Sequence, residues 1–147
     1  MKQKPVFMLV CLLAICMTMQ FASAQDDVAS TQRISIDSNG NPGNSWSDQP
    51  VMSSDGRYVV FRSDASNLVD GDTNGQYDIF VHDRQTGITT RASVDSNGTE
   101  ANSWSACPRI SADGSYVVFD SAASNLVDND TNGGSDAFVH DRQTGIT

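Results

Sequence analysis

The strongest constraint on the fold of this chain is a repeat with a period of 58 residues. Shifting the sequence by 58 positions lays residues 33–89 on residues 91–147 without a gap, and 40 of these 57 pairs are identical. Trp46 then matches Trp104. A repeat of this kind is a supersecondary unit that buries its apolar surface against its neighbours. We therefore divide the chain into the repeat units 33–90 and 91–147.

Each unit contains four short runs of β-branched and aromatic residues separated by turn residues, which is typical of β-strands. In the first unit the expected strands cover residues 49–53, 57–63, 77–83 and 88–95. Asp55-Gly56 marks a hairpin turn after the first of them. Val59 and Phe61 fall on one face of the second strand and Tyr58 and Val60 on the other, so we expect both faces to be covered. The sequence predicts an all-β fold with two four-stranded antiparallel blades of a β-propeller.

The motifs of the repeat resemble those of TolB-type β-propeller repeats. They are Pro50, Ser53, Asp55-Gly56, the strand Tyr58-Val59-Val60-Phe61 and the stretch from Asp83 to Gly87. The long-unit form of that repeat, common in exported bacterial proteins, also carries an Asp-x-Asp-x-Asn-Gly loop before its third strand. The resemblance covers nearly all of residues 33–147. It implies blades around a central channel that serve as a binding or scaffolding module.

Two repeat units are fewer than a closed propeller contains, since propellers close with about 4 to 8 blades. The repeat region begins with residues 33–37, which match the end of a fourth strand, and the second unit stops at the beginning of its own fourth strand. We favour the explanation that the chain is a fragment of a longer propeller. The alternative is self-association, in which residues 33–37 of one copy complete the last blade of a neighbour and the ring closes by symmetry.

The first 24 residues have the pattern of a signal peptide, which places the predicted propeller segment at residues 25–147. Lys2 and Lys4 form a basic start, an apolar run covers residues 6–19, and Ala22-Ser23-Ala24 supplies small residues before a cut at Gln25. The apolar run is shorter than the roughly 20 residues that cross a bilayer. We expect a secreted or periplasmic protein without stable membrane insertion after cleavage.

The charge of the chain excludes a protein that binds nucleic acid through phosphate contacts. The full sequence has 9 basic and 18 acidic residues and a net charge of −9. Removal of Lys2 and Lys4 with the signal peptide leaves seven arginines against 18 acidic residues, so the net charge of the mature chain is 7 − 18 = −11. A phosphate-binding surface needs the opposite sign. Cys107 is the one cysteine after residue 24, so an intrachain disulfide cannot form in the mature chain.

Two acidic loops, one in each unit, are candidate calcium sites. Oxygen-bearing side chains stand at positions 1, 3, 5 and 9 of each loop, Gly stands at position 6, and position 7 offers a backbone carbonyl. The candidate ligands are Asp70, Asp72, Asn74, Gln76 and Asp78 in the first loop, and Asp128, Asp130, Asn132, Gly134 and Asp136 in the second. This pattern supplies most of the oxygen ligands with which protein loops coordinate Ca²⁺. The alternative is that these residues form ordinary Asx-turns.

The loops are not EF-hands, because Val81 and Val139 occupy the twelfth position, where an EF-hand has a bidentate Glu. We therefore expect a structural Ca²⁺ bound weakly, with a dissociation constant on the order of 10⁻⁴ to 10⁻³ M.

The remaining candidates fit structural roles better than chemical ones. His82 and His140 recur in separate blades, too far apart for a shared zinc site. Trp46 and Trp104 could stack on sugars or peptides at one end of the channel, but we favour packing between blades. Cys107 matches Gln49 in the other unit, and we expect a buried, inert thiol.

The sequence lacks the common nucleophile-elbow, zinc-protease and phosphate-loop motifs. We expect a non-enzymatic module that binds a protein or glycan. The alternative is the propeller portion of a secreted or periplasmic hydrolase or lyase whose catalytic residues lie outside this chain.

Overall fold

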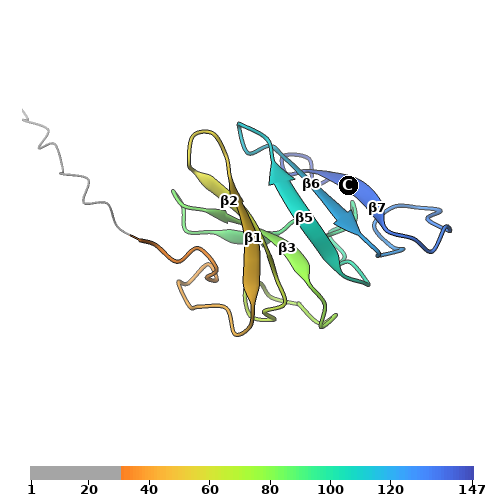
Figure 1. Ribbon diagram of the computed structural model, residues 1–147, viewed down its shortest axis with the longest axis horizontal. Helices are drawn as coiled ribbons and strands as arrows, with labels where there is room; N and C mark the ends of the chain where they lie inside the picture. Colours follow the sequence, from red (N-terminus) through yellow and green to blue (C-terminus); the bar gives the residue numbers. More distant parts are fainter. Residues whose placement is uncertain (1–30) are drawn as a thin grey trace, which may run out of the picture. The chain divides into compact units, whose positions relative to one another are not determined.

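The computed structural model describes residues 31–147, which form one compact unit. The predicted signal peptide lies outside the described residues. Within residues 31–147 the regular structure is β-strand, arranged in two antiparallel sheets (Figure 1). No helix of this part of the chain has the length and apolar character needed to cross a membrane. The predicted all-β fold class is confirmed.

The first repeat unit folds into a four-stranded sheet. Its strands are β1 (Ser47–Met52), β2 (Tyr58–Ser63), β3 (Asp78–Asp83) and β4 (Thr89–Arg91). They lie in the order β1-β2-β3-β4, and every neighbouring pair is antiparallel. Each strand is hydrogen-bonded to the one that precedes it in the sequence. This is the arrangement of one propeller blade.

The second unit repeats this topology. Its strands are β5 (Ser105–Ile110), β6 (Tyr116–Ser121) and β7 (Asp136–Asp141), in the order β5-β6-β7. Where the first blade has β4, the second has an isolated bridge between Asp141 and Ile146. The second blade therefore has three strands and the beginning of a fourth, as the sequence predicts.

The fourth strand is shorter than expected. The sequence predicts a strand over residues 88–95, whereas β4 covers Thr89–Arg91. The chain turns at Asp95, whose carboxylate accepts hydrogen bonds from the backbone N–H groups of Asn97 and Thr99. Residues 33–37 likewise form no strand and contribute only a bridge between Ile36 and Pro42. In both units an Asp at the same repeat position favours a tight turn over a longer ladder.

A β-bulge interrupts the first strand of each blade at the same place. The register of β1 on β2 shifts between Asp48 and Val51, and that of β5 on β6 shifts between Ala106 and Arg109. Gln49 and Cys107 have positive φ angles of 53° and 55° at these bulges. Each is followed by a proline, which cannot donate a ladder hydrogen bond and is therefore accommodated at a bulge.

The main hydrophobic core lies between the two blades. Val60, Ile79 and Val81 of the first blade belong to one buried cluster with Val117 and Phe119 of the second. A smaller cluster on the other face of the first blade contains Phe61 and Phe80. Both faces of β2 are thus covered, as the alternating pattern predicts. Strand β5 packs against β1, β2 and β3, so the two blades share one folded unit.

Candidate functional site

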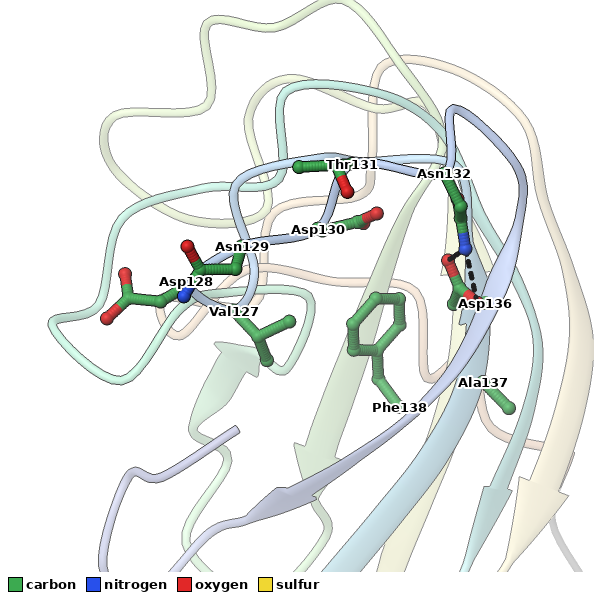
Figure 2. A pocket seen from close by; sticks show the side chains of 9 residues that line it. All are labelled: Val127, Asp128, Asn129, Asp130, Thr131, Asn132, Asp136, Ala137 and Phe138. Carbon is green, nitrogen blue, oxygen red and sulfur yellow. Dashed lines mark hydrogen bonds between the residues drawn. The ribbon is translucent and has the colours of Figure 1, made fainter.

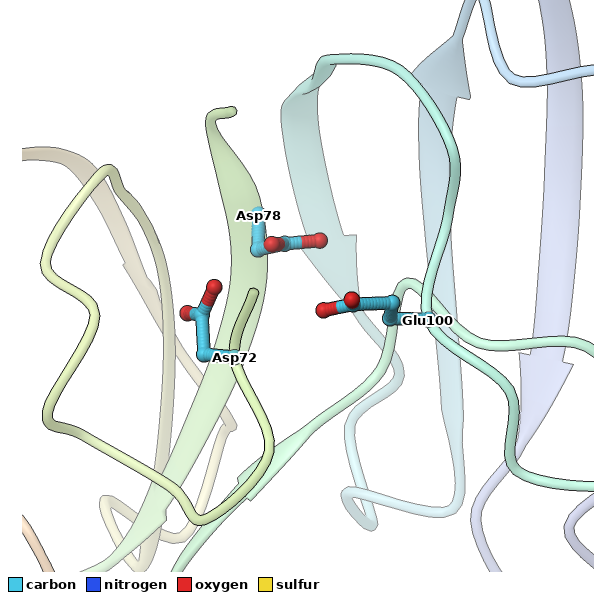
Figure 3. Close-up of side chains that lie close together, drawn as sticks. All are labelled: Asp72, Asp78 and Glu100. Carbon is cyan, nitrogen blue, oxygen red and sulfur yellow. The ribbon is translucent and has the colours of Figure 1, made fainter. Parts of the chain in front are cut away.

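Three carboxylates meet where the two repeat units join. Asp72 lies in the loop before β3, Asp78 is the first residue of β3, and Glu100 comes from the segment that leads to β5. One oxygen from each carboxylate lies within 4.8 Å of the other two, and Figure 3 shows the three side chains directed toward one another. The acidic cluster therefore combines two predicted ligands from the first unit with a residue of the second.

Arg91 carries the positive charge nearest to this cluster. Its Nη1 lies 2.7 Å from an oxygen of Glu100 and 3.7 Å from oxygens of Asp72 and Asp78. The Arg91 side chain is only 9% exposed, and its Nε has no hydrogen-bond partner. One guanidinium faces three carboxylates, so the group carries a formal charge of −2 when all four side chains are ionised.

Burial changes the proton affinity of two of these carboxylates. Asp78 is fully buried, and burial raises the pKa of its carboxyl to about 6 despite a hydrogen bond from Ser93. Burial also raises the pKa of Asp72, which Arg91 opposes. The cause in both cases is that the protein interior solvates a charged carboxylate less well than water does. Burial therefore disfavours the charged form of both carboxylates.

The other predicted ligands of the first loop are placed differently. The Asn74 Nδ2 donates to Asp78 and to the backbone carbonyl of Ala101, and its Oδ1 accepts from the backbone N–H of Gln76. Asp70 and Gln76 are exposed. The structure therefore brings Asp72 and Asp78 together, while Asn74 acts as a hydrogen-bond bridge between the two repeat units.

The second loop has the same internal contacts but a more open setting. Asn132 donates to both oxygens of Asp136, and its Oδ1 accepts from the N–H of Gly134. Figure 2 shows the loop above Phe138, with Asp128 and Asp136 at opposite ends. A hollow of about 420 Å³ lies between the loop and this ring. Asp130 also lines this hollow, but among the described residues no three acidic or other ligating side chains of this loop bring their ligand atoms within 4.8 Å of one another.

Sequence reasoning missed Glu100 and Arg91, which complete the first cluster. A signal was present, because Glu100 is the one glutamate in the sequence and stands where the first unit has Pro42. Its contact with the loop depends on how successive units pack, however. Thr73 donates to Glu100 through both its backbone N–H and its hydroxyl, and nothing within a single unit predicts that contact.

The two tryptophans are exposed, which corrects our preferred expectation that they pack between blades. The exposed fraction is 78% for Trp46 and 40% for Trp104. Trp46 directly precedes β1 and Trp104 directly precedes β5. Neither tryptophan belongs to the two buried core clusters.

Cys107 is also exposed, so the expected buried thiol is wrong. The positive φ at Cys107 belongs to the bulge of β5, and its backbone N–H donates to the Oε1 of Gln49 on the neighbouring blade at 2.8 Å. Cys107 therefore contributes to the fold through its backbone, at the bulge and in the hydrogen bond to Gln49, and its thiol is exposed.

The histidines have the structural role expected of them. The Nδ1 of His82 lies 2.9 Å from the hydroxyl of Thr89, and His140 makes the same contact with Thr147. Burial lowers the pKa of both imidazoles, so both favour the neutral form. Each ring is therefore held by a contact with a threonine of its own blade.

Comparison with known proteins adds one structural likeness. No family model matches the chain, and no curated protein matches it. Among solved structures, the chain is similar to a protein assigned as TolB from Agrobacterium tumefaciens, with a TM-score of 0.44 and 22% sequence identity. The match covers 67% of this chain and 31% of that protein. The chain thus spans about a third of the length of that protein.

Proposed function

We propose that this chain is an exported, non-enzymatic β-propeller module that binds a protein or glycan. The observation that carries the proposal is the pair of exposed tryptophans, Trp46 and Trp104, at the same position of two adjacent blades. An indole offers a rigid apolar face for stacking and an N–H donor at its edge, which suits sugar rings and extended peptides. The N-terminal pattern supports export, and an N-terminus at Gln25 in the mature protein would establish it.

Replacement of either tryptophan by alanine is expected to weaken ligand binding by about tenfold, because each change removes one stacking surface. Binding is measured by passing the wild-type chain, W46A and W104A over immobilised polysaccharides and immobilised unfolded proteins. Ile88→Ala is the control, since Ile88 is an exposed apolar residue at 46% exposure that lies directly before β4. The proposal is contradicted if W46A and W104A retain the captured ligand as tightly as the I88A control.

We further propose that the two acidic loops hold structural Ca²⁺. The support is the donor set at the first loop, where Asp72, Asp78 and Glu100 offer carboxylate oxygens within 4.8 Å of one another. Hard oxygens of this kind are the ligands that Ca²⁺ prefers. In the second loop Asp130 and Asp136 would take part. The ion would lower the repulsion among the carboxylates and hold the second unit against the first.

Millimolar Ca²⁺ is therefore expected to raise the melting temperature of the chain. A ligand that binds only the folded state at ten times its Kd stabilises that state by about 1.4 kcal/mol. The measurement is a thermal melt in EDTA and in CaCl₂, with NaCl of equal ionic strength as the control. In E100Q, which lacks one of the clustered carboxylates, the Ca²⁺ effect should shrink. An identical melting curve in CaCl₂ and in the NaCl control would rule the calcium sites out.

A further inference from the structure

Equivalent residues of the two repeat units differ sharply in exposure on one face of the blade. Val60 and Val81 are 0% and 1% exposed, because the second blade covers them. Their repeat equivalents, Val118 and Val139, are 41% and 53% exposed, and Tyr116 is 48% exposed. We call Tyr116, Val118 and Val139 the outer face of the second blade. This face is apolar for the same reason as its buried counterpart, yet it lies in solvent.

The opposite difference occurs at the other end of the chain. Ser105 is 0% exposed on β5, which packs on the first blade, whereas its equivalent Ser47 on β1 is exposed. Pro108 is buried and Pro50 is exposed. Met52 is 56% exposed, whereas its equivalent, a half-buried isoleucine of β5, packs against the core between the blades. We call Ser47, Pro50 and Met52 the β1 edge. One chain therefore carries both halves of the contact that joins its two blades.

The contact inside the chain shows how the two halves fit. The Tyr58 ring of the first blade packs over Gly114 of the second, where a Cβ atom would come within 2.1 Å of the ring. The guanidinium of Arg142 lies over the same ring, with its Cζ 4.4 Å from the ring centroid. The backbone N–H of Ser105 donates across the blades to the carbonyl of Tyr77 at 2.7 Å.

Every one of these partners but one has an identical counterpart on the free surfaces. Tyr116 stands on the outer face in the place of Tyr58, and Gly56 and Arg84 stand beside the β1 edge in the places of Gly114 and Arg142. Ser47 repeats Ser105 as the backbone donor. The exception is Tyr77, which is a serine in the second unit, but the bond there uses only its backbone carbonyl. The surface that fits the outer face is therefore present on another copy of this chain.

We propose that a second copy docks its β1 edge on the outer face of the second blade, repeating the contact between the two blades. The interface is heterologous, because different surfaces of the two copies meet, and such contacts form rings when the rotation closes. Propellers close with about 4 to 8 blades, so a ring built from copies of residues 31–147 alone contains about two to four copies. The proposal depends neither on the ligand of the module nor on calcium.

Light scattering after size exclusion tests the proposal on the wild-type chain of the sequence above. The expected mass is two to four times that of the monomer. Val118→Asp places a charge on the outer face and should give a folded monomer, as judged by its circular dichroism. Ile88→Asp is the matched control, because Ile88 and its equivalent Ile146 are 46% and 58% exposed in their respective units. I88D should keep the wild-type mass. A monomeric wild-type chain, or a V118D variant with the wild-type mass, would overturn the proposal.

A mixing experiment separates a head-to-tail contact from a symmetric one. Met52→Asp disables the β1 edge, so M52D alone should also be a monomer. Each variant then retains the surface that the other lacks, and an equimolar mixture of V118D and M52D should form a one-to-one heterodimer. If the outer face instead paired with itself, M52D would remain associated and the mixture would contain no heterodimer. Either of these two results would refute the head-to-tail arrangement.

Discussion

Val60→Asp is expected to abolish folding, whereas Val118→Asp leaves a folded chain. The two valines occupy the same position in adjacent repeat units, and the exposed fraction is 0% for Val60 and 41% for Val118. An unpaired carboxylate at Val60 would lie in the core between the blades, where burial of a charge costs several kcal/mol. That cost is comparable with the whole free energy of unfolding of an ordinary domain, about 5 to 15 kcal/mol.

The comparison needs only chemical denaturation followed by circular dichroism. V60D should show no cooperative transition, and V118D should unfold within about 1 kcal/mol of a wild-type chain held at a concentration low enough to remain monomeric. The pair is informative because the substitution is the same and each valine lies in the same Tyr-Val-Val-Phe sequence of its strand. Equal stability of the two variants would mean that the second blade does not cover the first.

Gly114→Ala is expected to destabilise the chain more than Gly56→Ala. Both glycines have positive φ, 74° and 72°, so the backbone strain of adding a side chain is the same at the two positions. The new Cβ at position 114 would lie 2.1 Å from the ring of Tyr58, whereas at position 56 the nearest atom is the Met52 sulfur at 3.6 Å. Overpacking of this kind costs about 1 to 3 kcal/mol beyond the strain.

The test is the difference in free energy of unfolding between G114A and G56A, which cancels the shared strain. Tyr58→Ala in the G114A background supplies the control, because removing the ring should relieve the clash. In that background, the loss in free energy of unfolding caused by Gly114→Ala should approach the loss caused by Gly56→Ala. A difference near zero between G114A and G56A would show that Tyr58 does not rest on the second blade.

Much of the fold could be predicted because short stretches of the sequence determine its strands and turns. Strands β2 and β3 match the expected segments within one residue at each end, since β-branched runs between turn residues define them. The alternation of Tyr58, Val59, Val60 and Phe61 correctly predicts a strand covered on both faces. The fourth strand was harder to delimit, because the turn at Asp95 ends it earlier than its apolar pattern suggests.

The candidate site was predictable only in part, because it is assembled from both units. Asp72 and Asp78 follow from the spacing within one loop, and Arg91 lies on the adjacent strand β4, but the contacts of Glu100 depend on the packing of one unit on the next. The exposure of Trp46 also could not be predicted from the sequence. A large aromatic residue is usually buried, whereas Trp46 is 78% exposed and lies outside both core clusters.

Hydrogen exchange at the backbone amide of Ser105 tests most directly whether the two repeats pack as adjacent blades. This N–H donates to Tyr77 across the two sheets rather than within its own. In V118D, the variant designed to be a monomer, the Ser105 amide should be protected as strongly as the amides of β3, while that of the equivalent Ser47 exchanges quickly. Exchange of the Ser105 amide at the rate of an unstructured peptide, with β3 still protected, would contradict the account.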